Sequence, residues 1–253
     1  MVKIKIPKYE FLDIDLVIFD KDGTLIELHR YWSEMIKMRS DRIVSEFGLN
    51  QETRDQLSSA MGVNPITGKL KAEGPVGIKK REVVMDAAIQ HLSTIGYENT
   101  KNTVDKIFLE VDSLSLKMLD ELIYPISGAE KIINNLHSAG CSVAIATTDR
   151  VERATIAMKY LGFMDHIDLV VGTDTVNKPK PFPDMIEYAL NKLAVKSSAS
   201  LMIGDSISDI EAGINAKVQG SIGVLTGQTY YEDLKKKTPY IIDSIASLKV
   251  LQQ

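Results

Sequence analysis

Short apolar runs recur along the chain, and Val, Ile and Leu fill them without polar residues in alternation. This pattern is typical of strands that are buried on both faces of a parallel sheet. Several of the runs end in a small or acidic residue, which places polar groups at the ends of hydrophobic strands. We therefore expect strands within residues 15–20, 142–147, 168–173, 200–205, 221–227 and 240–244.

Segments with helical spacing separate these runs. In 128–140, for example, Ile132, Ile133 and Leu136 lie on one face of a helix, and Gly140 is placed to end it. Strands and helices that alternate over short connections predict βαβ units, and hence an α/β fold with a doubly wound, Rossmann-like parallel sheet. The other helices expected in this part of the chain are 150–162, 183–194 and 207–216.

The segment 29–123 breaks this alternation because it has no comparable strand run. It indicates an all-helical cap domain, inserted after the first strand into a core made of 1–28 and 124–253. Its hinges are expected near Leu28–Arg30 and Tyr124–Pro125. The insertion is expected to contain helices at about 30–47, 51–61, 77–95 and 101–122, and a loop rich in Gly and Pro at 62–77.

The composition narrows the class of protein. Of 253 residues, 44% are hydrophobic and 25% are charged, which is typical of a soluble globular protein with a sizeable core. The net charge of −4 argues against a nucleic-acid partner, and no stretch approaches the ~20 apolar residues of a membrane span. Cys141 is the only cysteine and is expected in the core, so a cytoplasmic protein without disulfides is indicated. We expect a monomer or a homodimer.

Polar side chains follow the expected strands at the points where the strands end. Asp20 and Asp22 follow the first strand, Thr147 ends the second, and Asp205 ends the fourth. Ligands of doubly wound sheets bind beyond the carboxyl ends of the strands. We therefore expect these residues to face one crevice.

A divalent metal ion would relieve the repulsion between carboxylates that crowd together there. Mg²⁺ suits such a site because it takes oxygen ligands and usually keeps waters and a substrate phosphate. Asp20 and Asp205 are the best-placed pair of ligands. Asp209 follows Asp205 on the first turn of the next expected helix, where it would support the direct ligands.

An aspartate at this position can also attack phosphorus and form an aspartyl phosphate. The phosphoryl oxygens then need cations and hydrogen-bond donors, which Mg²⁺, Lys178 and the Thr147 hydroxyl would supply. Gly23 would let backbone N–H groups approach the phosphate. Asp22, two residues after Asp20, has the spacing of an acid that protonates the leaving oxygen and later accepts a proton from water.

The sequences DKDGTL, a threonine at a strand end, KPKP and GDSISD follow one another in this order. They resemble the four motifs of the haloacid dehalogenase superfamily, most closely its phosphoglycolate phosphatase-like members with a helical cap. The resemblance covers essentially the whole chain. It implies Mg²⁺-dependent hydrolysis of a phosphomonoester, a small phosphorylated metabolite, through an aspartyl-phosphate intermediate.

The resemblance also implies a role for each motif residue. Asp20 would be the nucleophile and Asp22 the general acid and base. Asp20, Asp205 and the backbone carbonyl of Asp22 would hold the metal ion, with Asp209 behind them, while Lys178 would stabilise the nucleophile and the phosphate. The residues that would contact the phosphoryl group are Thr147, Thr148, Gly23 and Thr24.

Three positions depart from the family's pattern or leave a choice. Thr148 stands where phosphoglycolate phosphatases commonly have Asn, and the missing amide counts against phosphoglycolate itself. The KPKP motif offers two lysines; Lys178 is preferred because it opens the Lys-Pro pair, and Lys180 is the alternative. Lys21 is not diagnostic, and strand alternation predicts that its side chain points away from both aspartates.

Other activities share these motifs. Asp22 argues against a dehalogenase, which needs no acid there, and against a phosphonatase, which would replace it. A phosphomutase of a sugar phosphate stays open because it differs mainly in how well water is kept from the intermediate, and a non-catalytic phosphate-binding protein is the other alternative.

In the insertion, a basic cluster is either a solvated surface or the source of a contact to a second anionic group of the substrate. Its members are Lys69, Lys71, Lys79, Lys80 and Arg81.

Overall fold

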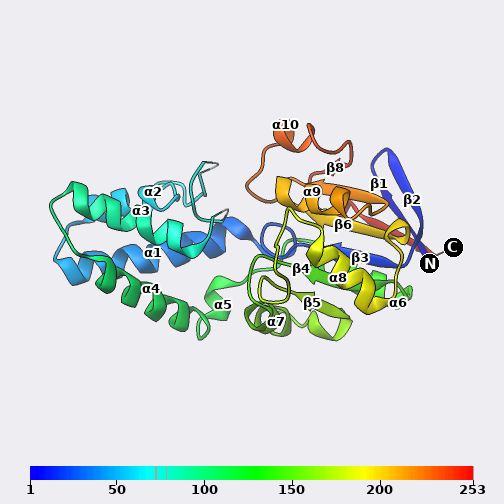
Figure 1. Cartoon of the computed structure of the whole chain (residues 1–253), viewed down its shortest axis with the longest axis horizontal. Coiled ribbons are helices and arrows are strands. Elements are labelled where there is room, and N and C mark those ends of the chain that lie inside the picture. The colour runs from blue at the N-terminus through cyan, green and yellow to red at the C-terminus, as the bar shows by residue number, and fades with distance from the viewer. Residues whose placement is uncertain (72, 78, 253) are drawn as a thin grey trace. The chain divides into compact units, whose positions relative to one another are not determined.

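All six apolar runs form strands of one parallel sheet in the computed structural model, which describes residues 1–71, 73–77 and 79–252. The strand order is β5-β4-β3-β6-β7-β8, and every neighbouring pair is parallel, so the expected doubly wound sheet is confirmed (Figure 1). The strands are β3 (Leu16–Phe19), β4 (Ser142–Ala146), β5 (Leu169–Val171), β6 (Ser200–Gly204), β7 (Gly220–Val224) and β8 (Ile241–Ile242).

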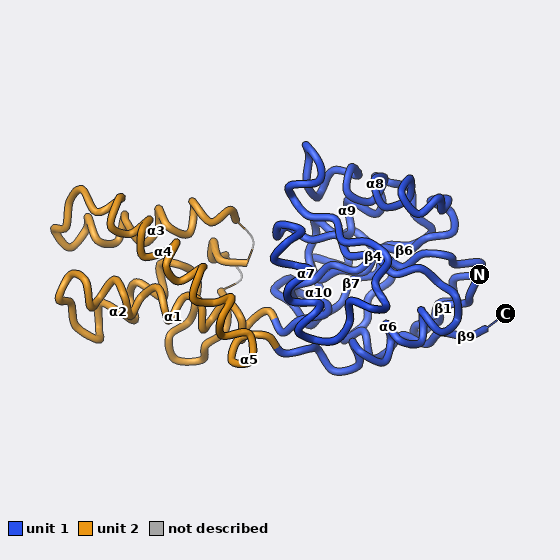
Figure 2. Tube along the Cα trace, turned by 90° about the horizontal axis from the view of Figure 1, so that it is seen from below, with its two compact units in different colours: residues 1–27, 124–253 blue, residues 28–123 orange. Residues whose placement is uncertain are grey.

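Two units divide the chain, and each has its own interior (Figure 2). The core unit comprises residues 1–27 and 124–253 and contains the parallel sheet. The helical unit comprises residues 28–123.

Helices α8 (Asp184–Leu193) and α9 (Ile207–Asn215) pack on one face of the parallel sheet. Leu16 and Ile18 of β3 are buried together with Met185 and Ile186 of α8 in one apolar cluster. All four residues of β3 are buried, which explains why the run shows no polar alternation. The other helices of the core unit are α6 (Ala129–Ser138), α7 (Val151–Tyr160) and the short α10 (Tyr231–Leu234).

A second, three-stranded sheet in the core unit was not expected from the apolar runs. It has the order β2-β1-β9, pairs antiparallel, and consists of β1 (Val2–Ile6), β2 (Tyr9–Ile14) and β9 (Lys249–Gln252). Val2, Ile4 and Ile6 are buried while Lys5 is exposed, so the charges of this segment are the polar half of a period-two pattern. This alternation is the pattern in the sequence from which the strand could have been predicted. It differs from the continuous apolar runs that predicted the parallel sheet.

The described residues of the helical unit form helices, as the sequence indicates, and no regular strand. The expected helix at 101–122 is divided, because residues 116–118 separate its two parts. Ala72 in the expected loop and Ile78 in the expected helix 77–95 lie outside the described residues. The helices are α1 (Leu28–Phe47), α2 (Gln51–Ala60), α3 (Arg81–Thr94), α4 (Lys101–Ser115) and α5 (Leu119–Leu122).

Two further expectations concern single features of the chain. Within the described part of the chain, every helix is too short or too polar to cross a membrane. Cys141 is buried just before β4, as expected, and burial raises the pKa of its thiol to about 12. This thiol is therefore protonated and unreactive near neutral pH.

Candidate active site

The candidate site lies where the chain leaves the central strand of the parallel sheet. Phe19 of β3 is level with Ile145 of β4 on one side and with Ile203 of β6 on the other. Asp20, the next residue, continues this register and donates its backbone N–H to the carbonyl of Ile203 at 2.8 Å. The order of strands reverses at β3, and ligands of open α/β sheets bind at such switch points.

Three buried carboxylates meet at this point. Each of Asp20, Asp205 and Asp209 offers an oxygen, and these oxygens all lie within 4.8 Å of one another. Asp205 is enclosed by glycines: a Cβ atom on Gly23 would lie 2.6 Å from its Cγ, and one on Gly227 would overlap the carboxylate itself. Close packing of backbone thus fixes the position of the Asp205 side chain.

The start of α9 holds Asp209 in place through a reciprocal capping arrangement. The Ser206 hydroxyl accepts a hydrogen bond from the Asp209 N–H, and the Ser206 N–H donates to Asp209 Oδ2 at 2.9 Å. This capping box orients the other oxygen of Asp209 toward the site. Asp209 thus lies beside Asp20 and Asp205, the two residues that the sequence analysis expects to hold a metal ion.

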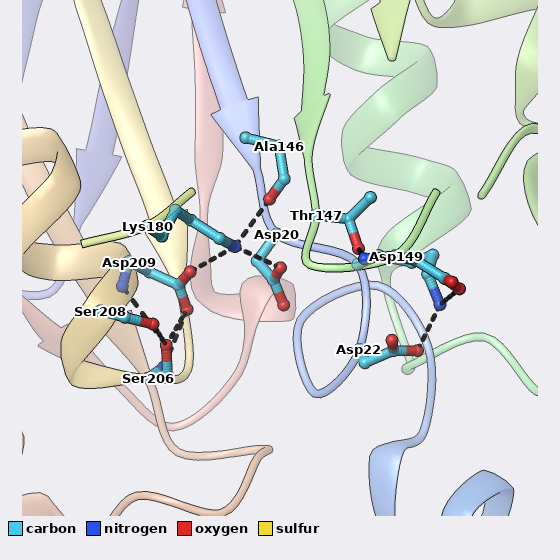
Figure 3. Close-up of polar contacts among 10 residues, drawn as sticks. Asp20, Asp22, Ala146, Thr147, Asp149, Lys180, Ser206, Ser208 and Asp209 are labelled. Carbon is cyan, nitrogen blue, oxygen red and sulfur yellow. Dashed lines mark hydrogen bonds and ion pairs between the residues drawn. The ribbon is translucent and has the colours of Figure 1, made fainter. Parts of the chain in front are cut away.

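The lysine that lies among the three carboxylates is Lys180, the alternative in the sequence analysis, and not the preferred Lys178. The buried Lys180 Nζ lies 2.7 Å from Asp20 Oδ1, 2.6 Å from Asp209 Oδ1 and 2.7 Å from the carbonyl oxygen of Ala146 (Figure 3). Lys178 is exposed, and its ammonium nitrogen lies 5.3 Å from the ring centroid of Phe182. Both lysines precede a proline, so only the three-dimensional path of the segment distinguishes them.

Burial dominates the electrostatics of the cluster. It raises the pKa of Asp20 to about 7, opposed by Lys180 and reinforced by Asp209 and Asp22. Burial, followed by the charges of Asp20 and Asp209, raises the pKa of Asp205 well above its usual range. Burial alone would lower the pKa of Lys180, but the adjacent carboxylates outweigh it and the pKa is raised. A protonated Lys180 therefore neutralises only part of the carboxylate charge.

The donor set fits a hard divalent cation. Three carboxylates face one ammonium group, which leaves an excess of negative charge in a buried place. Oxygen donors of this kind suit Mg²⁺, which is commonly bound by one or two carboxylates together with a substrate phosphate. Asp205 forms no ion pair with Lys180 among the described residues, and Asp20 contacts Lys180 through Oδ1 alone, whereas both oxygens of Asp209 are engaged, one by Lys180 and the other by Ser206.

Asp22 lies on the side of Asp20 opposite to Asp209, together with Asp149 (Figure 3). The expectation that Lys21 points away from both aspartates is wrong. Its buried ammonium nitrogen lies 2.6 Å from Asp22 Oδ1 and 3.5 Å from Asp149 Oδ2. Strand alternation does not apply here, because β3 ends at Phe19 and Lys21 belongs to the turn that follows.

Thr147 directly follows the last residue of β4 and is buried, whereas its neighbour Thr148 is exposed. The Thr147 hydroxyl accepts a hydrogen bond from the backbone N–H of Asp149 at 3.1 Å. It does not cap α7, whose N-cap is Arg150. The hydroxyl hydrogen of Thr147 therefore remains available to a ligand.

Gly23 and Thr24 form the turn after Asp20. Gly23 has φ of +85°, a backbone conformation that side chains disfavour. Thr24 is fully buried, and its hydroxyl has no hydrogen-bond partner among the described residues. Contact between this turn and a ligand would therefore involve the backbone rather than the Thr24 side chain.

The basic cluster of the helical unit is divided between its interior and its surface. Arg81 lies 2.9 Å from Asp112 and 3.1 Å from Asp105, so it ties α3 to α4. The lysines of the cluster are exposed: Lys69, Lys71, Lys79 and Lys80. Arg81 thus has a structural role within this unit.

Comparison with known proteins gives relatives of two kinds. A phosphoglycolate phosphatase from Nitrosococcus oceani is 24% identical over 238 residues, which cover 94% of this chain and 96% of the relative. Pyrophosphatase PpaX from Halalkalibacterium halodurans is 35% identical over 103 residues, covering 41% of this chain and 48% of the relative. The pyrophosphatase match therefore spans about half of that protein.

Solved structures share the fold over most of the chain. A predicted phosphoglycolate phosphatase from Haemophilus somnus superposes with a TM-score of 0.72 at 18% identity, covering 92% of this chain and 96% of that one. A proposed β-phosphoglucomutase from Thermotoga maritima superposes with a TM-score of 0.67 at 18% identity, covering 90% of this chain and 94% of that one.

The sequence model of the haloacid dehalogenase-like hydrolases matches residues 17–223, which include every motif described above. The chain belongs to the haloacid dehalogenase-like hydrolases.

Proposed function

We propose that the protein is a Mg²⁺-dependent phosphatase that hydrolyses a small phosphomonoester through an aspartyl-phosphate intermediate. One observation carries the proposal: Asp20 stands at the switch point of the sheet, in contact with the Lys180 ammonium and with a carboxylate oxygen within 4.8 Å of one of Asp205. A nucleophile, a fixed cation and a set of metal ligands are thus within one small volume. The relatives named as phosphatases over nearly the whole chain support this assignment.

In the first step, the Asp20 carboxylate attacks the phosphorus atom of the ester. A bond forms between an oxygen of Asp20 and phosphorus, and the bond from phosphorus to the ester oxygen breaks. Asp22 donates its proton to that leaving oxygen, which departs as an alcohol.

In the second step, water attacks the phosphorus of the aspartyl phosphate. Asp22, now a carboxylate, takes one proton from this water, and the bond between phosphorus and Asp20 breaks. Inorganic phosphate leaves, Asp20 is again a carboxylate, and Asp22 is again protonated, so the cycle closes.

Fixed positive charge and hydrogen-bond donors stabilise the transferring group. The Lys180 ammonium stabilises the Asp20 carboxylate, which it contacts. The Thr147 hydroxyl and the backbone N–H groups of the turn at Gly23 would donate hydrogen bonds to the phosphoryl oxygens. Mg²⁺, held by Asp20, Asp205 and the backbone carbonyl of Asp22, would neutralise charge on the phosphoryl group. Asp209 keeps Lys180 and the ligand region in place.

The substrate is a small phosphorylated metabolite, and the helical unit serves as the cap that selects it. Relatives named for phosphoglycolate and for pyrophosphate define the range of substrates to examine first. Thr148 lacks the amide that phosphoglycolate phosphatases commonly have there, so we expect another phosphomonoester to be preferred.

A panel of phosphorylated metabolites, scored by release of inorganic phosphate with Mg²⁺ and with EDTA, tests the proposal. We expect Mg²⁺-dependent release from at least one member, abolished in Asp20→Asn. Release that survives this substitution, or that needs no metal, would contradict the mechanism.

A phosphomutase is the second candidate, because the protein shares its fold with a proposed β-phosphoglucomutase. Sugar phosphates in the same panel separate the two activities. A phosphatase yields free phosphate, whereas a mutase yields an isomeric sugar phosphate.

A further inference from the structure

Lys21 is a buried cation in the turn that carries the nucleophile. Only 4% of its side chain is exposed, and burial of an ammonium group is costly unless carboxylates pair with it. Its Nζ donates to Asp22 Oδ1 at 2.6 Å and lies 3.5 Å from Asp149 Oδ2. The side chain therefore bridges two carboxylates of different loops.

Asp149 lies in the loop after β4 and is held there by hydrogen bonds. Its backbone N–H donates to the Thr147 hydroxyl at 3.1 Å, and its carbonyl accepts from the Thr173 N–H at 3.0 Å. The Arg150 N–H donates to Asp149 Oδ1 at 3.1 Å. Lys21 thus connects the turn after β3 to the hydrogen-bonded loop after β4.

One oxygen of Asp22 is engaged and the other is open. Lys21 contacts Oδ1, whereas no described residue forms a hydrogen bond or ion pair with Oδ2. With 15% of its side chain exposed, Asp22 is accessible to a ligand. The contact to Lys21 therefore fixes the rotation of the carboxylate and presents Oδ2 for proton exchange.

We propose that Lys21 is a positioning residue, which together with Asp149 holds the Asp22 carboxylate in place for proton transfer to the leaving group. This inference rests on the proposed phosphatase function. General acids act within hydrogen-bond reach of the proton acceptor, and a displacement of about 1 Å can lower a rate by about a hundredfold. A geometric restraint on Asp22 is therefore worth a measurable part of the rate.

The leaving group distinguishes this role from a merely structural one. p-Nitrophenolate departs without a proton because it is a weak base, whereas the alkoxide of glycerol phosphate requires one. In Lys21→Met we expect kcat for glycerol phosphate to fall by about ten- to a hundredfold. The fall for p-nitrophenyl phosphate should be several times smaller, and Asp22→Asn should show the same asymmetry.

Variants of the same chain serve as controls. Lys21→Arg keeps the charge and should recover most of the rate with glycerol phosphate, and Asp149→Asn should give a partial loss. Lys21→Met/Asp22→Asn should be no slower than Asp22→Asn, because a residue that acts through Asp22 has no effect once that acid is gone. Lys159→Met, which removes an exposed lysine of α7, should behave like the wild type.

Thermal unfolding of each variant shows whether it is folded. Equal losses with both substrates in folded Lys21→Met, or losses that multiply in the double variant, would overturn the inference. A wild-type protein that releases phosphate from no ester of the metabolite panel, these two included, with Mg²⁺ present would instead contradict the proposed function on which the inference rests.

Discussion

The ammonium nitrogen of Lys180 lies 2.7 Å from Oδ1 of Asp20, although the two residues are 160 positions apart in the chain. The same nitrogen lies 2.6 Å from Asp209, so one cation joins the residue that follows β3 to the helix that follows β6. The segment between β5 and α8 is thereby part of the candidate active site.

Replacing Lys180 and Lys178 one at a time should show which of the two lysines supports catalysis. We expect Lys180→Ala to lower kcat by about a hundredfold or more, because a fixed cation beside the transferring phosphoryl group is lost. Lys178→Ala, which removes an exposed ammonium group two residues earlier, should change kcat by less than about twofold. The ordering is checked by steady-state kinetics on folded proteins, and the reverse ordering would restore Lys178 as the active-site lysine.

The raised pKa of Asp20 predicts how the metal-free protein responds to pH. Burial raises this pKa from 3.8 to about 7, so between these values the folded state binds more protons than the unfolded state. The contribution of Asp20 to stability is therefore present at low pH and is lost as pH rises toward 7. In EDTA, we expect Tm of the wild type to fall relative to Tm of Asp20→Asn as pH increases from 4 to 8. Each kcal/mol of unfolding free energy that is lost should lower Tm by about 2–4 °C. A difference in Tm that is constant over this range would show that Asp20 titrates normally.

Addition of Mg²⁺ should stabilise the folded protein, because a ligand that binds only the folded state raises its stability. At a concentration a hundredfold above Kd the gain is about 2.7 kcal/mol. We expect a rise in Tm for the wild type that Asp205→Asn largely loses and that Asp165→Asn, at an exposed aspartate, retains. An equal rise in all three proteins would place the metal elsewhere.

Gly227 offers a test of the metal site that leaves every carboxylate in the chain. A Cβ atom at this position would overlap the Asp205 carboxylate, so Gly227→Ala should displace that side chain. We expect weaker Mg²⁺ binding by about tenfold, read from the concentration at which Mg²⁺ raises Tm. Gly223→Ala, whose Cβ would lie 3.2 Å from a methyl of Leu234, is the matched control and should keep wild-type affinity. Unchanged affinity in Gly227→Ala would mean that Asp205 is not a ligand.

The strand ends could be read from the sequence because their signal is local. A continuous apolar run that stops at Asp20 or Asp205 marks both a buried strand and the edge where its polar residue emerges. The parallel sheet and the meeting of Asp20, Asp205 and Asp209 were predictable for this reason. The antiparallel sheet of β1, β2 and β9 was missed because its alternation of Lys with Val or Ile resembles a polar segment.

The sequence alone could not distinguish the two lysines of the KPKP motif. Lys178 and Lys180 each precede a proline, so only the tertiary path of the segment decides which one is buried against Asp20. Lys21 follows a strand, yet its side chain direction is set by a turn whose geometry depends on Gly23 and on contact with Asp149. Long-range contacts of this kind leave no periodic pattern in the sequence.

The most direct test of the central claim is to look for the phosphoryl group on Asp20. The protein is mixed with substrate and Mg²⁺, quenched in acid within milliseconds, digested and measured by mass spectrometry. We predict a peptide containing Asp20 that carries the mass of one added phosphoryl group, present during turnover and absent from Asp20→Asn. Substrate turnover by the wild type without any such peptide, or with the phosphoryl group on another residue, would contradict the assignment of Asp20 as the nucleophile.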